Sequence, residues 1–576
     1  MPVPPWLFLI GGALILPVLP KLLRSPAFLL TSLLSMAFVW FIPEGARFEV
    51  PFASYTLILC QMDQLSRVFG TIFALIAFAG GVYGFRVQST GEQVAALLYA
   101  ASALGVTFAG DYVTLFFFWE LMAVSSTYLV WARRTVESQR AGIRYLLVHL
   151  FGGSLLLAGI LLHTVKTGTI LISAFEPDAS ASAWLILGGV ALNAAIPPLH
   201  AWLVDAYPRA TVAGAVFLSA FTTKAAVYVL VRIFPGWDIL IAFGVLMALY
   251  GVVYAVLAND IREILAYHII SQVGYMVAGV GIGTEMSLNG TTAHAFSHIL
   301  YKALLFMGAG VVLHTTGRSK LTELGGLARA MPAVLALYMV GAFSISGFPL
   351  FNGFISKGMV VSAAAEAHFE IAVLLLHLAS VGTFLHTGLK LPYFTWFAEE
   401  STALPTKTPP SMLVGMSIVA FFCALFGIAP SLLYRHLPFN ASFEPYTIPH
   451  LVETTQLLVF TFMSFWVFRR HLRGEFTISL DTDWLYRKPA RVVNRSVVLS
   501  AGAFFDAAER IAETVVKQLT IILGNPWPRT RGIFQHEWGA NVPAAFEPNA
   551  ARPPMEKVIA LVLACFLLAA LLSVAR

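Results

Sequence analysis

The sequence predicts an all-α protein that crosses a membrane many times. Of its 576 residues, 58% are hydrophobic and only 11% are charged, whereas soluble domains carry about 25% charged residues. Apolar runs long enough to cross a bilayer, about 20 residues each, recur roughly fifteen times. Only one short stretch, residues 47–62, alternates apolar and polar side chains as a β-hairpin does. The low charged fraction and the repeated apolar runs exclude a soluble globular protein.

The first part of the chain contains six predicted spans. They are residues 6–19, 27–42, 65–83, 94–109, 112–131 and 145–163. No basic leader precedes Trp6 and no small-residue cleavage site follows it. We therefore expect the first apolar stretch to be a retained helix and not a signal peptide.

The next apolar region, residues 183–234, is too long for one straight crossing. It contains Pro197, Pro198, Pro208 and Gly214, which interrupt a helix and free its backbone groups. Interrupted helices at membrane depth are typical of ion or substrate sites. The piece after this predicted break carries Lys224.

The later spans are predicted at residues 239–257, 267–281, 291–313, 332–345, 371–397, 412–433 and 451–468. A second Gly/Pro interruption, residues 346–357, ends at Lys357. The long span 371–397 holds Lys390 just before Pro392, and we expect it to be a broken helix as well. Two interrupted, lysine-bearing segments in two halves are typical of an inverted-repeat transporter.

The character of the chain changes after residue 468. Residues 469–554 are polar, but within them residues 492–523 mix apolar and charged side chains. This pattern predicts an amphipathic helix that lies on the membrane or on partner subunits. Residues 557–574 are a last predicted span.

The net charge of +6 resides mainly in the loops between spans. It indicates membrane orientation and anionic lipid as the partner, not nucleic acid. The arginine-rich loop 133–144 is the predicted cytoplasmic side. Counting alternate crossings places 318–329 and 469–473 on the opposite side, whereas the basic-loop rule groups all three together.

No redox or nucleotide chemistry is visible in the chain. Cys60, Cys423 and Cys565 are far apart and match no disulfide, metal or iron–sulfur spacing. A glycine-rich nucleotide loop is also absent from the sequence. We therefore expect no cofactor in this chain.

Three titratable side chains share one face of the predicted span 291–313. His294, His298 and Lys302 stand at i, i+4 and i+8, which on a helix forms a ladder about 12 Å long. A cation near the bilayer centre costs at least about 2.5–3.5 kcal/mol and usually has a function. Histidine and desolvated lysine titrate near physiological pH, so the ladder is predicted to pass protons.

Other ionisable groups fall within the apolar segments. Glu120 and Lys224 would favour each other's charged form if they approached, and a proton arriving nearby would weaken the pair. The remaining candidates are Lys390 and, in supporting roles, His149, His200, Asp205 and Lys357. Structural alternatives remain open: an interhelical donor for His149, snorkelling for Lys357, a static Glu120–Lys224 pair, and a ladder that only packs helices.

Six segments of the chain, taken together and in order, resemble one known family. They are residues 118–122, 195–203, 222–232, 260–276, 294–305 and 347–357. The family is that of proton-conducting antiporter-like membrane subunits. It includes the membrane-arm subunits of complex I, the Mrp-type Na⁺/H⁺ antiporter subunits and membrane-bound hydrogenase subunits. The resemblance covers about residues 65–435.

The resemblance implies a core of about fourteen helices with two inverted five-helix repeats and broken helices. We expect N-terminal helices in 1–90, the first repeat in 91–260 and the second in 261–435. Residues 436–576 would then hold the C-terminal helices, including an amphipathic segment and a final transmembrane helix.

The same resemblance assigns roles to the titratable residues. Glu120 and Lys224 would form the paired site of one half-channel. Lys302 would be the central lysine, fed by His294 and His298. Lys390 would open the second half-channel.

The expected function is proton translocation by one membrane subunit of a multisubunit ion-pumping complex in the cell inner (plasma) membrane. The chain would be a translocase subunit without a redox centre of its own, as in an NADH:quinone oxidoreductase-like or hydrogenase-like complex. Three alternatives stay open: an Mrp-type Na⁺/H⁺ antiporter subunit, a component that energises inorganic-carbon uptake, and a non-conducting scaffold. The expected partners are other membrane subunits, the lipid bilayer, protons and, in the antiporter alternative, Na⁺.

Overall fold

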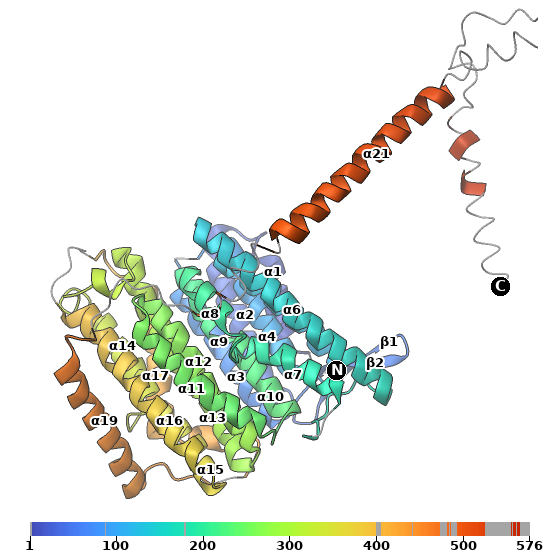
Figure 1. Ribbon diagram of the computed structural model, residues 1–576. Helices are drawn as coiled ribbons and strands as arrows, with labels where there is room; N and C mark the ends of the chain where they lie inside the picture. Colours follow the sequence, from blue (N-terminus) through green and yellow to red (C-terminus); the bar gives the residue numbers. More distant parts are fainter. Residues whose placement is uncertain are drawn as a thin grey trace, which may run out of the picture. The chain divides into compact units, whose positions relative to one another are not determined.

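The computed structural model describes most of the chain as a helical bundle (Figure 1). The residues it describes are 3–86, 88–177, 180–398, 405–440, 442–472, 481–482, 484, 492, 494–524, 555, 557–559 and 562–564. The chain divides into two units, Met1–Asp483 and Trp484–Arg576. The first unit contains the bundle and every candidate residue named above.

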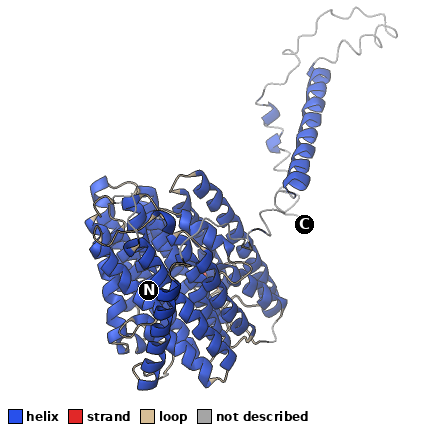
Figure 2. Ribbon diagram, turned by 60° about the vertical axis from the view of Figure 1, so that its left-hand side comes forward, coloured by secondary structure: helices blue, strands red, loops and turns tan. Residues whose placement is uncertain are grey.

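The bundle begins with two helices and a hairpin. Helices α1 (Trp6–Ile15) and α2 (Lys21–Phe41) precede strands β1 (Arg47–Phe52) and β2 (Tyr55–Gln61), which pair antiparallel. The predicted hairpin is therefore confirmed. Among the described residues these two strands form the only sheet, and Figure 2 shows the dominance of helix.

The next four helices are α3 (Gln64–Tyr83), α4 (Thr90–Phe108), α5 (Tyr112–Trp131) and α6 (Val136–Thr167). Each begins directly after a capping side chain, and the caps are Asp63, Ser89, Asp111 and Thr135. These side chains accept hydrogen bonds from orphan amides of the first turn, which fixes the start of each helix.

The first predicted break is present between residues 193 and 212. Helix α7 (Ala181–Asn193) ends there, and a short α8 (Ala201–Ala206) and the 3₁₀ turn η1 (Tyr207–Arg209) follow. Helices α9 (Val212–Ala220) and α10 (Thr222–Ile233) then run back through the bundle. The region 183–234 thus crosses the bundle twice.

The second half of the bundle is built around one long helix, α13 (Glu285–Thr316), whose residues 287–312 are all buried. It follows α11 (Ile239–Leu257) and α12 (Ile261–Ile282). The later elements are η2 (Leu321–Glu323), α14 (Pro332–Ser346), α15 (Asn352–Glu366), α16 (Glu370–Thr383), η3 (Phe384–Lys390), η4 (Tyr393–Phe397), α17 (Pro410–Ile428), α18 (Ser431–Tyr434) and α19 (Ile448–Phe468).

The second Gly/Pro interruption is confirmed between α14 and α15, where Gly347 adopts φ +80° and ends α14. The break expected at Pro392 takes a different form. Residues 384–390 and 393–397 are π-helical, and Pro392 itself has helical dihedrals. A π-helical turn widens the helix without ending it, so the span 370–397 continues past Lys390.

The bundle has the burial pattern of a membrane protein. Among the described residues, eleven helices are long and apolar enough to cross a bilayer, and three shorter apolar helices accompany them. The interior collects buried polar groups such as His298 and Gln272, while large apolar side chains such as Val165, Ile371 and Ile448 face outward. Lipid contact explains this outward apolar surface.

The arginine-rich loops lie at one end of the bundle, which we call the basic end and define by residues 132–135 and 317–331. Thr211 N donates to Leu129 O at the end of α5, and Arg262 donates to the Thr211 carbonyl. Asp260, the cap of α12, forms an antiparallel bridge with Lys320. The two loops are therefore linked through successive contacts.

Helix α19 also ends at the basic end. The ring of Tyr393 packs edge to face against Phe465 near the end of α19, and the carbonyl of Trp396, three residues after Tyr393, accepts from Ala328 N in the loop 317–331. The count of alternate crossings was wrong because residues 183–234 cross twice. The basic-loop rule gives the observed grouping.

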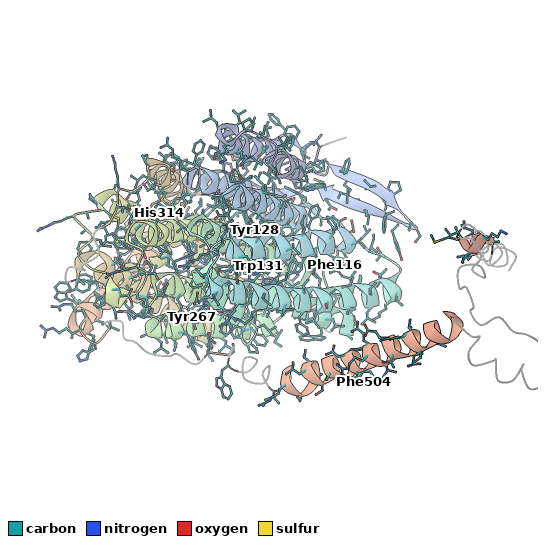
Figure 3. All side chains as sticks on the ribbon, turned by 90° about the horizontal axis from the view of Figure 1, so that it is seen from above. Phe116, Tyr128, Trp131, Tyr267, His314 and Phe504 are labelled. Carbon is teal, nitrogen blue, oxygen red and sulfur yellow. The ribbon has the colours of Figure 1, made fainter. Side chains whose placement is uncertain are left out.

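The second unit contains the predicted amphipathic helix. It is α21 (Leu499–Gly524), preceded by the π-helical turn η5 (Asn494–Val498). Phe504, Ile511, Val515 and Leu519 recur along one stripe, and the aromatic ring of Phe504 stands out from the helix in Figure 3. Most of the predicted last span, 557–574, lies outside the described residues.

Candidate functional site

The ladder on α13 is fully buried. His294, His298 and Lys302 each have no exposed surface. The imidazole centroids of His294 and His298 are 6.3 Å apart. The sequence therefore placed all three side chains correctly in the interior, on the helix that the other helices surround.

Three other buried lysines share one arrangement. The ammonium of Lys224 donates to Ser219 O at 2.6 Å, that of Lys357 to Ile345 O at 2.9 Å, and that of Lys390 to Val256 O at 2.7 Å. These carbonyls lie in the last turns of α9, α14 and α11, where helical partners are missing. The negative end of each helix dipole favours a cation there.

Lys302 differs from these three lysines. It lies in the middle of the unbroken α13, and its ammonium nitrogen is buried without a hydrogen-bond partner among the described residues. It interacts electrostatically with His268, His298 and Lys224. A charge at this position is therefore the least supported of the four by fixed dipoles.

Two histidines that the sequence analysis did not select connect Lys302 to Lys390. His268 on α12 and His386 in the π-helical η3 are both fully buried, with ring centroids 5.5 Å apart. His268 interacts with Lys302, and His386 interacts with Lys390. Each is a titratable side chain within an apolar span. His386 stands four residues before Lys390, which is a helical spacing, whereas His268 has no titratable residue three or four positions away.

The expected Glu120–Lys224 ion pair is not formed. Lys224 turns to Ser219 O and Thr223 Oγ1, as the break after α9 offers a free carbonyl close to its own backbone. Glu120 faces α6, where Gly153 leaves the space that its carboxylate occupies, and Glu120 Oε1 is buried without a partner among the described residues. The helix break thus decides the partner of Lys224.

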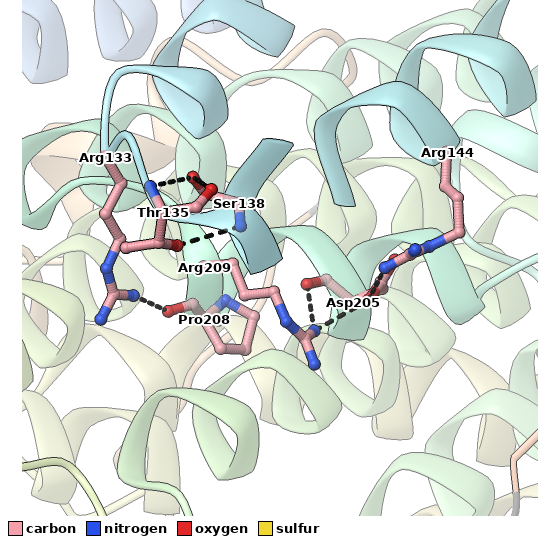
Figure 4. A network of polar contacts seen from close by, with 7 residues as sticks. All are labelled: Arg133, Thr135, Ser138, Arg144, Asp205, Pro208 and Arg209. Atoms are coloured by element: carbon pink, nitrogen blue, oxygen red, sulfur yellow. Dashed lines mark hydrogen bonds and ion pairs between the residues drawn. The ribbon is translucent and has the colours of Figure 1, made fainter. Parts of the chain in front are cut away.

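Two of the supporting candidates, His149 and Asp205, make contacts that hold neighbouring helices together. His149 stacks on Tyr145 at 4.0 Å, packs against Trp202, and bonds through Nδ1 to its own helix at Tyr145 O. Asp205 accepts from Arg144 at 2.6 and 2.9 Å and from Arg209 at 2.8 Å (Figure 4). This ion cluster fixes α8 against α6 at the basic end.

His200, in the first break, has a partner from far along the chain. Its Nε2 lies 3.0 Å from Asp481 Oδ1, while Tyr250 and Tyr267 donate to the same carboxylate. Burial raises the pKa of Asp481, but the hydrogen bonds from His200 and the two tyrosines outweigh it, so the pKa lies well below its usual range. The carboxylate therefore stays ionised at all physiological pH values.

Lys357 opens onto a cavity and does not snorkel to the surface. The cavity, about 70 Å³, is lined by α15, α16 and α19, and one water molecule needs about 10–15 Å³. The polar groups in its wall include Ser380, His377 and Glu453. His377 Nε2 bonds to Glu453 Oε1 at 3.2 Å, which ties α16 to α19.

Within the described residues no cluster of three His, Cys, Asp or Glu side chains has the arrangement of a metal site. Cys60 and Cys423 are buried and unpaired. The polar interior therefore offers lysine, histidine and tyrosine, groups that transfer protons.

Comparison with known proteins places this interior in a family. Residues 109–385 match the family described as NADH:quinone oxidoreductase/Mrp antiporter, transmembrane. The chain is 32% identical over 389 residues to the uncharacterized protein MJ1309 of Methanocaldococcus jannaschii, covering 64% of this chain and 80% of that protein. It is 30% identical to a Na⁺/H⁺ antiporter subunit of Alkalihalophilus pseudofirmus, covering 58% and 73%. The chain belongs to this family.

The antiporter-like fold extends beyond the matched residues. The Mrp complex from Dietzia sp. DQ12-45-1b contains a chain that superposes with a TM-score of 0.69 at 22% identity, over 80% of this chain and 98% of that chain. Longer relatives are matched only in part: this chain spans 47% of another Na⁺/H⁺ antiporter subunit from Alkalihalophilus pseudofirmus. Lys390 and Asp481 both lie outside the residues 109–385 that define the antiporter-like family match.

Proposed function

We propose that this chain is a proton-translocating subunit of a multisubunit ion-pumping membrane complex. One observation carries the proposal: a buried series of lysines and histidines continues from Lys224 to Lys390. Its intermediate members are His298, Lys302, His268 and His386, and each neighbouring pair interacts electrostatically.

The arrangement suits proton transfer because its members are supported unequally. A buried cation is expensive unless fixed dipoles stabilise it. Lys224 and Lys390 each have a helix-end carbonyl, whereas Lys302 has none among the described residues. A charge on Lys302 therefore lacks the helix-end carbonyl that each flanking lysine has, so Lys302 can pass its proton to a neighbour as the charges nearby change.

Transport against a gradient needs an energy source, which we place in other subunits. The titratable groups named here move protons but supply no free energy themselves. We infer a set of membrane partner subunits and a location in the cell inner (plasma) membrane. The exposed apolar stripe of α21 offers those partners or the lipid surface a place to bind.

Na⁺/H⁺ antiport is the second candidate. The specific observation in its favour is the 30% identity to a protein named as a Na⁺/H⁺ antiporter subunit. Proton flux that requires Na⁺ on the opposite side of vesicles would favour antiport. Flux driven by a redox substrate without Na⁺ would favour a respiratory complex.

The central test is Lys302→Ala in the whole purified complex, reconstituted in vesicles. Proton flux should fall to the level of empty vesicles while the subunits still copurify. Lys166→Ala is the matched control, since Lys166 is exposed at the end of α6 and its loss should leave flux unchanged. Full flux in Lys302→Ala would refute the proposed pathway.

A further inference from the structure

The strongest feature that the pathway from Lys224 to Lys390 does not use is the carboxylate of Asp481. It comes from the chain after α19 and binds at the first break, about 280 residues earlier in sequence. Oδ1 accepts from His200 Nε2 at 3.0 Å, and Oδ2 accepts from Tyr267 at 2.7 Å. Tyr250 and the Thr482 amide also donate to Oδ1, each at 2.5 Å.

These four donors nearly saturate the carboxylate, which has about four acceptor positions. The side chain of Asp481 is only 9% exposed and that of His200 is fully buried. A saturated, buried anion is poorly suited to pick up a proton. Asp481 therefore acts as a fixed negative charge beside His200.

The partner of Asp481 is arranged differently. His200 gives Nε2 to the carboxylate, and its other ring nitrogen, Nδ1, is buried without a partner among the described residues. Asn193 Oδ1, at the start of the same break, is likewise buried and unpartnered there. Two unpaired polar atoms at one helix break indicate a place where a proton or water can be accommodated.

Among the described residues, the carboxylate of Asp481 interacts with His200, Tyr250 and Tyr267, and these two tyrosines interact with Tyr254 and Glu263. Tyr254 stacks on both Tyr250 and Tyr267, and Glu263 interacts with Tyr267. These titratable groups are neutral or negative at physiological pH. Among these groups only the imidazole of His200 has a cationic form.

We propose that Asp481 is a positioning residue that makes His200 a proton-loading site. The site lies in the first break, at the basic end of the bundle. Asp481 holds the ring with Nε2–H toward the carboxylate, which leaves the Nδ1 lone pair to accept a proton. The imidazolium formed is balanced by the carboxylate, and loss of the same proton from Nδ1 restores the neutral ring. This inference rests on the proposed proton translocation.

The proposal gives the chain after α19 a part in transport. The first break and its His200 lie within the residues matched by the antiporter-like family, whereas Asp481 does not. Thr482 adds a second contact, with its hydroxyl donating to Pro198 O at 3.2 Å. A segment outside the family-matched residues 109–385 thus completes a site within them.

The test compares the pH dependence of proton flux in vesicles that contain the whole complex. Asp481→Asn keeps the shape but removes the charge, so the imidazolium loses its partner. Flux should fall about tenfold and its midpoint should move to lower pH. Asp481→Glu, which keeps the charge, should restore part of the flux and the original midpoint.

Two further variants separate positioning from simple attachment. Thr482→Ala removes the other contact of the same segment and should leave the midpoint unchanged. Tyr267→Phe removes one competing donor, so the carboxylate holds the His200 proton more strongly and the midpoint should move to higher pH. If the complex with Asp481→Asn does not assemble, the shift expected for Tyr267→Phe still tests the role of Asp481.

The outcomes distinguish this inference from the proposed function. Wild-type flux and midpoint in Asp481→Asn, or an equal shift in Thr482→Ala, would overturn the role of Asp481. If Lys302→Ala abolishes flux in the same experiment, proton translocation stands and only the inference fails. If Lys302→Ala has full flux, the proposed function itself fails.

Discussion

The ammonium of Lys224 lies 2.6 Å from the carbonyl oxygen of Ser219, in the last turn of α9. The same relationship recurs at Lys357 with Ile345 and at Lys390 with Val256. A helix end supplies each of these lysines with a negative partial charge without an acidic residue. Breaks in the helices thus take the place of the ion pair that the sequence suggested.

Lys224→Met tests this role of the helix end. Methionine keeps the length of the side chain and leaves the Ser219 carbonyl unpaired, which costs about 1–3 kcal/mol. The loss of a buried ammonium offsets part of that cost. We expect nearly unchanged thermal stability of the complex but proton flux at background. Stability that falls together with flux would point to a structural cation.

Gly153→Ala tests the position of Glu120. A β-carbon at residue 153 would overlap Glu120 Oε1, so the carboxylate must leave its place. Overpacking of this kind costs about 1–3 kcal/mol. Flux should fall several-fold, as measured in vesicles. Gly188→Ala on α7 is the matched control, because its β-carbon would meet only Leu155 Cδ1 at 3.7 Å.

His386→Leu separates transport from stability more sharply. Both ring nitrogens of His386 are buried without hydrogen-bond partners among the described residues, so leucine removes no bond there. We expect an unchanged or slightly higher melting temperature and a large loss of flux, since His386 is the residue that interacts with both His268 and Lys390. His314→Leu, at the exposed end of α13, should retain flux. Full flux in His386→Leu would exclude the part of the pathway between Lys302 and Lys390.

The ladder and the breaks were predictable because their signals are local. His294, His298 and Lys302 follow helical spacing, and Gly347 with Pro349 interrupts an apolar run. The span α5 was predicted at its observed bounds because apolar length alone defines it. Such features depend on only a few neighbouring residues.

The partners of the titratable groups were not predictable in the same way. The contact between His200 and Asp481 joins residues about 280 positions apart, and only the packing of α11 and α12 brings Tyr250 and Tyr267 to it. Lys224 was expected to face Glu120, but a carbonyl five residues away was nearer. Glycine and proline predict where a helix break frees backbone groups, but the side chain that binds such a group is chosen by tertiary packing, which leaves no local pattern in the sequence.

Ser356→Ala tests the entry to the ladder, where the hydroxyl of Ser356 lies 3.1 Å from His294 Nδ1. That hydroxyl donates its one hydrogen to Asn352 O, so it must accept from His294 Nδ1–H. The ring is thereby held with a free lone pair on Nε2, toward the hydroxyl of Tyr301 at 3.5 Å.

Alanine at residue 356 removes this constraint and lets the ring adopt either tautomer. A neutral hydrogen bond contributes about 0.5–1.5 kcal/mol, and each 1.4 kcal/mol is about tenfold, so flux should fall by a factor of about 2 to 10. Ser362→Ala on the same helix should leave flux unaltered. A ring held by packing alone would give equal flux in both variants. Unequal flux, with the loss only at residue 356, makes the tautomer of His294 part of proton delivery to Lys302.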